Sequence, residues 1–248
     1  LVTNRGHEKR LRRQLEHGRE QKRLEREMSL RKAVYLEAAE AVTSSLAAFG
    51  RLADLSVPQD DLAKQFSEMT RALAKVQIIG SSATLSAVSI FSTEATSAVL
   101  ELTLARQPLL GKQGQLTMMD DQIKSSGEER DRMVQLMKQL NFEGDRDTNR
   151  WQFLKDTFEY EQKRVGETLA EQAKVRSEFW KEWLDYAQRC YETSTGISQL
   201  LVPAMRSVRE ELGLPFDAEA YRKRVEASQQ RQNQAMSEFF RRVQGLQG

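Results

Sequence analysis

Residues 76–105 read VQIIGSSATLSAVSIFSTEATSAVLELTLA and carry only two charged side chains, Glu94 and Glu101. Ten of these thirty residues are Ser or Thr, whose hydroxyls can bond back to backbone carbonyls one helical turn earlier. Apolar residues recur at helical spacing along two stripes, which are Ala83, Ala87 and Ile90, and Leu85, Val88, Ala95, Val99 and Leu102. A helix that is apolar and small-sided all round is typical of a position enclosed by other helices. The segment therefore predicts the centre of a helical bundle.

The rest of the chain is also helix-forming. Charged residues make up 30% of the 248 residues, only four are Pro, and Ala, Leu, Glu, Lys, Gln and Arg dominate. The single cysteine, Cys190, excludes an internal disulfide, and we expect it to be a small buried side chain. No run of about 18 consecutive apolar residues occurs, so we expect no membrane-spanning helix within the chain.

Apolar stripes and turn residues divide the chain into helices. The first stripe is expected to begin at Leu24 and Met28, in a helix that ends between residues 50 and 55. A second helix should open at Pro58, where Asp60 and Asp61 complement its N-terminal dipole. A long helix is expected over residues 148–212, and Asp217 should cap a final one.

Pro108 leaves two architectures open. If it only kinks the second helix, that helix runs to a turn at residues 141–147 and the long helix returns antiparallel to it, with facing residue numbers that sum to about 288. This favours an all-α, elongated antiparallel bundle with a protruding antiparallel coiled-coil hairpin. We expect a basic helical arm or stalk at 1–27, a four-helix body at 28–107 plus 181–248, and the hairpin at 108–180. If Pro108 makes a full turn, the alternative is a five-helix up-and-down array.

Charge is concentrated at the N-terminus. The first 32 residues hold eleven Lys or Arg against five Glu, whereas the whole chain has a net charge of only +2. Arginine recurs every seventh residue, and the cations expected to bind an anionic surface are Arg5, Lys9, Arg12, Arg19, Lys22, Arg23 and Arg26. No apolar stripe accompanies them, so the arm cannot dock on a core through its own side chains.

A basic run of this kind lies on the cytoplasmic side of membrane helices. Because the chain begins at Leu1 without an initiator Met, we expect a membrane anchor upstream of Leu1. An arbitrary domain boundary or a trimmed tag is the alternative.

Residues that could support catalysis are sparse. His7 and His17 both lie in the basic arm, and neither zinc-binding histidine spacings nor a phosphate-binding glycine loop occurs. Glu94 and Glu101 are expected to form structural ion pairs or to lie at an exposed helix edge, with proton handling as the less favoured alternative. We therefore predict no enzymatic activity, no cofactor, no metal and no small-molecule substrate.

Aromatic residues gather near the expected base of the hairpin. Phe179, Trp180 and Trp183 are core residues if they are buried, and a partner-docking patch if Phe179 or Trp180 is exposed. Long helices with thin apolar stripes and exposed Met also favour self-association.

Residues 23–39 read RLEREMSLRKAVYLEAA. This segment resembles bacterial membrane-anchored long-helix proteins in which a basic coiled-coil stalk enters a helical bundle. The resemblance covers about 40 residues and implies a membrane anchor, without an activity. Together with the basic run, it leads us to expect the protein at the cytoplasmic face of a bacterial inner membrane, or otherwise in the cytoplasm.

Two functions follow as expectations. The first is a membrane-tethered scaffold or protein-interaction module whose basic arm faces anionic lipid. The alternative is a coiled-coil nucleic-acid-binding protein that uses the same basic stripe, although five Glu interrupt the stripe and no aromatic residue interleaves with it.

Overall fold

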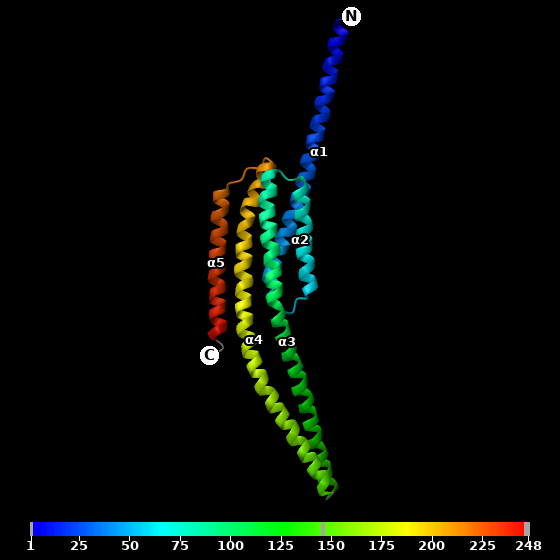
Figure 1. Cartoon of the computed structure of the whole chain (residues 1–248), viewed down its shortest axis with the longest axis vertical. Coiled ribbons are helices and arrows are strands. Elements are labelled where there is room, and N and C mark those ends of the chain that lie inside the picture. Colours follow the sequence, from blue (N-terminus) through cyan, green and yellow to red (C-terminus); the bar gives the residue numbers. More distant parts are fainter. Residues whose placement is uncertain (1, 145–146, 246–248) are drawn as a thin grey trace. The chain divides into compact units, whose positions relative to one another are not determined.

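The computed structural model describes residues 2–144 and 147–245, which form five helices in two compact units (Figure 1). The helices are α1 (Val2–Arg51), α2 (Gln59–Ile79), α3 (Ser82–Glu143), α4 (Thr148–Glu211) and α5 (Ala218–Gly245). One unit comprises residues 1–102 and 189–248, and the other comprises residues 103–188. The described residues contain no strand, so the all-α prediction is confirmed.

In the first unit the chain turns after α1 and again after α2. After α1 ends at Arg51, the Asp54 carboxylate accepts hydrogen bonds from the backbone N–H and the hydroxyl of Ser56. Helix α2 opens directly after Pro58, as predicted, with Asp60 and Asp61 in its first turn. The expected end of α1 and the expected start of α2 are confirmed.

The break between α2 and α3 was not predicted. Gly80 adopts an extended conformation, with φ of −71° and ψ of 153°, and its backbone N–H caps the Val76 carbonyl. A Cβ atom at Gly80 would lie 2.9 Å from that carbonyl oxygen, so only glycine fits this close approach without a shift. The first unit therefore contains all or part of five helices rather than four among the described residues. Helices α2 and α3 run in opposite directions (Figure 1).

The core of the first unit is built from buried residues of α1, α2, α3 and α4. Helix α1 enters it only at Tyr35, because Leu24 and Met28 are 53% and 43% exposed, so the predicted start of its apolar stripe was wrong. Phe49 and Phe66 pack edge to face with ring centroids 5.1 Å apart. Further core residues of this unit are Ala38, Val42, Ala48, Leu52, Leu62, Met69, Leu73, Val76, Val88, Phe91, Ala95, Leu102, Cys190, Ile197 and Ala204.

The charge-poor part of α3 is not enclosed on every side. Val88, Phe91, Ala95 and Leu102 are buried, but Ile90 and Leu100 are 56% and 61% exposed. The prediction of a fully surrounded helix was therefore wrong for one face. The physical reason lies partly in α5, which makes its side-chain contacts with α4: Tyr191 donates a hydrogen bond to Asn233, and Tyr221 to the sulfur of Met205.

The connection from α4 to α5 follows the predicted signals. Gly213 takes a positive φ of 66°, and the Leu214 N–H donates to the Arg209 carbonyl in the pattern of a helix C-terminal motif. The Asp217 carboxylate accepts a hydrogen bond from the Ala220 N–H and so caps α5, as predicted.

The second unit is an antiparallel pair formed by parts of α3 and α4. Helix α3 continues through Pro108, so the alternative with a full turn at this residue was wrong. Gln172 donates to the Asp120 carboxylate at 2.6 Å, about one helical turn from the partner that the predicted register assigned to Asp120. Toward the turn, Met133, Leu140 and Leu154 form a small core. The unit includes all of the predicted hairpin, residues 108–180.

Candidate interaction surfaces

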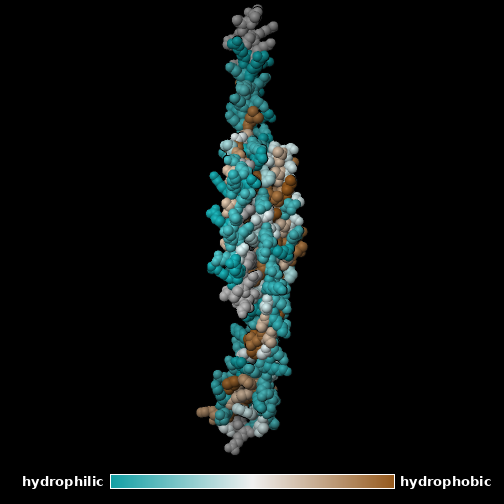
Figure 2. Space-filling view, turned by 90° about the vertical axis from the view of Figure 1, so that its left-hand side faces the viewer, coloured by the Kyte–Doolittle hydropathy of each residue, from teal (hydrophilic) through white to brown (hydrophobic). Residues whose placement is uncertain are grey.

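The N-terminal arm is a helix without a packing partner. From Arg12 to Leu30 every described side chain is exposed, with only the backbone of Gly18 half-buried. Figure 1 shows this part of α1 extending alone beyond α2, and in Figure 2 its described part is hydrophilic over almost its whole surface. We define the arm as residues 1–30, three residues longer than the sequence predicted.

The arm presents cations to solvent. Arg12, Arg19, Lys22 and Arg26 are exposed, and within the described residues none of them forms an ion pair. Arg23 is exposed but pairs with Glu20, and this hydrogen bond lowers the pKa of Glu20. The side chains of Arg5, Lys9 and His7 lie outside the described part, and His17 is exposed.

The predicted aromatic cluster lies in the second unit. Trp180 packs edge to face on Trp183 and on Phe179, with ring centroids 5.4 and 5.9 Å apart. Trp180 nevertheless keeps 40% of its surface exposed, while Phe179 and Trp183 are half-buried. We expected a partner-docking patch, and not a core position, if Trp180 was exposed, and this condition is met.

The two carboxylates of the charge-poor segment lie on an exposed part of α3. Glu94 and Glu101 are both exposed on α3, beside a shallow groove that Gly196 and Ile197 of α4 also line. Neither forms an ion pair among the described residues, so exposure at a helix edge is the alternative that holds. In the same described residues no cluster of His, Cys, Asp and Glu could hold a metal ion. Cys190 is 1% exposed, which confirms it as a buried side chain.

A polar cluster around the buried Glu211 side chain was not predicted from the sequence. One Glu211 carboxylate oxygen accepts hydrogen bonds from the Ser81 N–H at 2.9 Å and from the Thr84 hydroxyl at 2.7 Å. Its other oxygen lies 3.4 Å from Arg31 of α1. These residues come from α1, the start of α3 and the end of α4, so no local pattern could have joined them.

The pKa values of two ionisable groups in this cluster are shifted. Burial acts to raise the pKa of Glu211, but hydrogen bonds from Ser81 and Thr84 outweigh it and hold that pKa below its ordinary value. Burial, followed by the adjacent Glu211 carboxylate, raises the pKa of Tyr35. The arrangement keeps Glu211 ionised and Tyr35 neutral, which suits a structural role at the start of α3, where the helix dipole favours a negative charge.

One described helix, α3, is long and apolar enough to cross a membrane. We expected no span because Glu94 and Glu101 interrupt the apolar stretch of α3, but two charges do not exclude a membrane-spanning helix. Only 28% of that window is buried, although core helices of water-soluble proteins pass the same test.

Comparison with known proteins adds no relative. No protein-family model matches the chain, and no curated protein or solved structure is significantly similar to it.

Proposed function

We propose that the protein is a non-enzymatic helical scaffold whose arm binds an anionic membrane surface. The observation that carries this proposal is the solitary, hydrophilic arm with Arg12, Arg19, Lys22 and Arg26 exposed and unpaired among the described residues. These cations make no contact with the core and so do not stabilise the fold. Anionic lipid would attract them by about 1 kcal/mol for each Lys or Arg near the surface.

The arm's own contact with lipid should be peripheral and electrostatic. Its exposed apolar side chains, Leu15, Leu24, Met28 and Leu30, are scattered among charged residues and form no continuous apolar face that could insert into lipid. Binding should therefore weaken steeply with salt, because surface electrostatics are screened within a Debye length of about 10 Å at 0.1 M. We assign the arm to the cytoplasmic leaflet, which carries the anionic lipids.

The second part of the proposal is protein docking and self-association through the second unit. Trp180 is exposed within an aromatic cluster, and Met118 and Leu169 of the same unit are 73% and 47% exposed. Large apolar side chains that remain exposed on a thin two-helix pair are readily covered by a second copy.

A charge-reversal experiment tests the membrane proposal. The variant R12E/R19E should lose binding to vesicles containing one-third phosphatidylserine by at least about 30-fold, since two cations at about 1 kcal/mol each are removed. The matched control is K64E/R71E, which reverses two exposed cations at the same seven-residue spacing on α2. The control should bind like the unaltered protein. Equal loss in both variants would mean that net charge, and not the arm, controls binding.

Nucleic acid is the second candidate function, and the same exposed cations favour it. Filter binding of the same two variants to a 30-base-pair DNA and to a single-stranded RNA separates the proposals. Binding that depends on the arm, with a linear fall of log K against log salt, would favour nucleic acid if vesicle binding is absent.

A further inference from the structure

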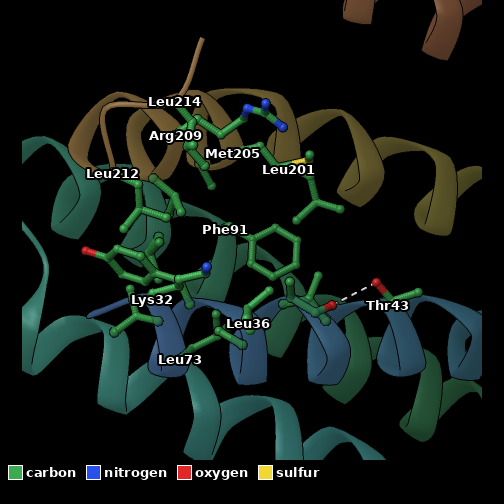
Figure 3. A pocket seen from close by; sticks show the side chains of 18 residues that line it. Lys32, Leu36, Thr43, Leu73, Phe91, Leu201, Met205, Arg209, Leu212 and Leu214 are labelled. Atoms are coloured by element: carbon green, nitrogen blue, oxygen red, sulfur yellow. Dashed lines mark hydrogen bonds between the residues drawn. The ribbon is translucent and has the colours of Figure 1, made fainter. Parts of the chain in front are cut away.

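An apolar cavity lies in the first unit between α1, α2, α3 and α4. It encloses about 360 Å³, within the range of small-molecule sites. Its walls are formed chiefly by aliphatic and aromatic side chains, including Leu36, Leu73, Phe91, Leu201, Met205 and Leu212 (Figure 3). At about 30 Å³ for a water-sized group, the volume holds on the order of a dozen methylene groups.

The cavity opens to solvent past apolar residues. Leu36 and Leu214 line it, yet they are 56% and 47% exposed. Large aliphatic side chains at the mouth of an apolar cavity leave unfavourable hydrated surface unless a ligand covers them.

Charge at the cavity has one sign. The lining residues include the cations Lys32 and Arg209 and no carboxylate. Arg209 is engaged elsewhere, because it donates to the Pro215 carbonyl at 2.9 Å and stacks over the Phe216 ring. Lys32 has no hydrogen bond or ion pair within the described chain, and in Figure 3 its nitrogen is directed into the cavity on the side of Phe91.

We propose that this cavity binds the alkyl chain of a fatty acid, with the ligand carboxylate paired to Lys32. The apolar walls match a single alkyl chain, whose burial is favourable by about 0.8 kcal/mol per methylene group. A carboxylate at the end of the alkyl chain would form a charge-assisted hydrogen bond with the Lys32 ammonium. This site is independent of the arm, so the inference holds or fails separately from membrane binding.

Two ligands that differ only in the head group test the charge pairing. Dodecanoate and dodecanol, both below their solubility limits, are titrated against the protein by displacement of a dansylated undecanoic acid. Lys32→Glu should weaken dodecanoate binding at least tenfold and leave dodecanol binding unchanged. Lys64→Glu, an exposed substitution of the same kind on α2, should change neither.

A second variant tests the location. Ala39 lines the cavity but is exposed at its edge, so Ala39→Phe narrows the cavity without replacing a core side chain. Ala39→Phe should weaken the binding of both ligands at least tenfold, whereas Ala63→Phe on α2 should weaken the binding of neither. The proposal is overturned if the unaltered protein binds no dodecanoate, if Lys32→Glu affects both ligands equally, or if Ala39→Phe binds both ligands normally.

Discussion

The Glu211 carboxylate at the end of α4 accepts a hydrogen bond from the Ser81 backbone N–H, 2.9 Å away, at the break between α2 and α3. The Thr84 hydroxyl donates to the same oxygen at 2.7 Å, so one carboxylate serves two donors at the start of α3. Residues that lie 130 positions apart in the sequence are thereby joined at one end of the first unit.

Glu211→Gln should destabilise the protein by about 1–3 kcal/mol at pH 7, because the Ser81 N–H and the hydroxyl of the buried Thr84 lose a charged acceptor. For a chain of this length the midpoint of thermal unfolding should fall by about 2–10 °C. Glu210→Gln is the control, since Glu210 is exposed and its ion pair with Arg206 lies on the surface. Circular dichroism melts check both variants, and equal midpoints for the two would contradict this role of Glu211.

The effect of Glu211 should depend on pH. A carboxyl group with a folded-state pKa below its unfolded value stabilises the protein above the unfolded pKa and loses that contribution as pH falls through the folded pKa. The ordinary value is 4.5, and the pKa of Glu211 is lowered from it. The difference in unfolding free energy between the unaltered protein and Glu211→Gln should be full at pH 7 and shrink below about pH 4.5. A constant difference from pH 7 to pH 3 would contradict the shift.

Two glycine substitutions should have opposite effects. Gly80→Ala places a Cβ 2.9 Å from the Val76 carbonyl oxygen and should cost about 1–3 kcal/mol. Gly111→Ala lies within α3 with nothing within 4 Å of the new Cβ, and it should stabilise the protein by about 0.5–1 kcal/mol. Urea unfolding measures both. If Gly80→Ala is neutral, the close approach is not what requires glycine at the break.

Helix identity was predictable because it depends on local pattern. The caps at Asp217 and Gly213 and the uninterrupted span of α4 follow from residues within a few positions of one another. Gly80 was missed because a lone glycine among helix formers is tolerated inside helices as often as it ends them. The break at Gly80 depends on its fit against Val76, which only the folded chain shows.

The candidate sites were predictable to different degrees. The cations of the arm could be identified from composition alone, since an exposed helix needs no tertiary contacts to present them. The cavity and the Glu211 cluster could not, because each is assembled from three or four helices that are distant in sequence. The register at Asp120 differs from the predicted one by about one turn, because it was inferred from an expected turn at residues 141–147, whereas α3 continues to Glu143 before α4 begins at Thr148.

Self-association should depend on Trp180. Trp180→Ser removes the exposed ring of the aromatic cluster and should raise the dissociation constant for a second copy at least tenfold, as for an aromatic residue central to an interface. Tyr160→Ser is the control, because Tyr160 is 62% exposed on the same helix but outside the cluster. Sedimentation equilibrium compares the two variants. An unaltered protein that stays monomeric, or equal effects of both substitutions, would contradict docking through Trp180.

Removal of residues 1–27 should leave the first unit folded. The described side chains of this segment make no core contacts, so the melting midpoint should change by less than about 1 °C. A clear loss of stability would show that the arm packs on the rest of the protein.

The same truncation provides the most direct test of the membrane proposal. The full chain and residues 28–248 are sedimented with phosphatidylserine-containing vesicles and with neutral phosphatidylcholine vesicles at 0.1 M salt. The full chain should bind only the anionic vesicles, and the truncated chain should remain in the supernatant with both. Retention of the truncated chain on the anionic vesicles would show that another surface, such as the exposed face of α3, makes the membrane contact.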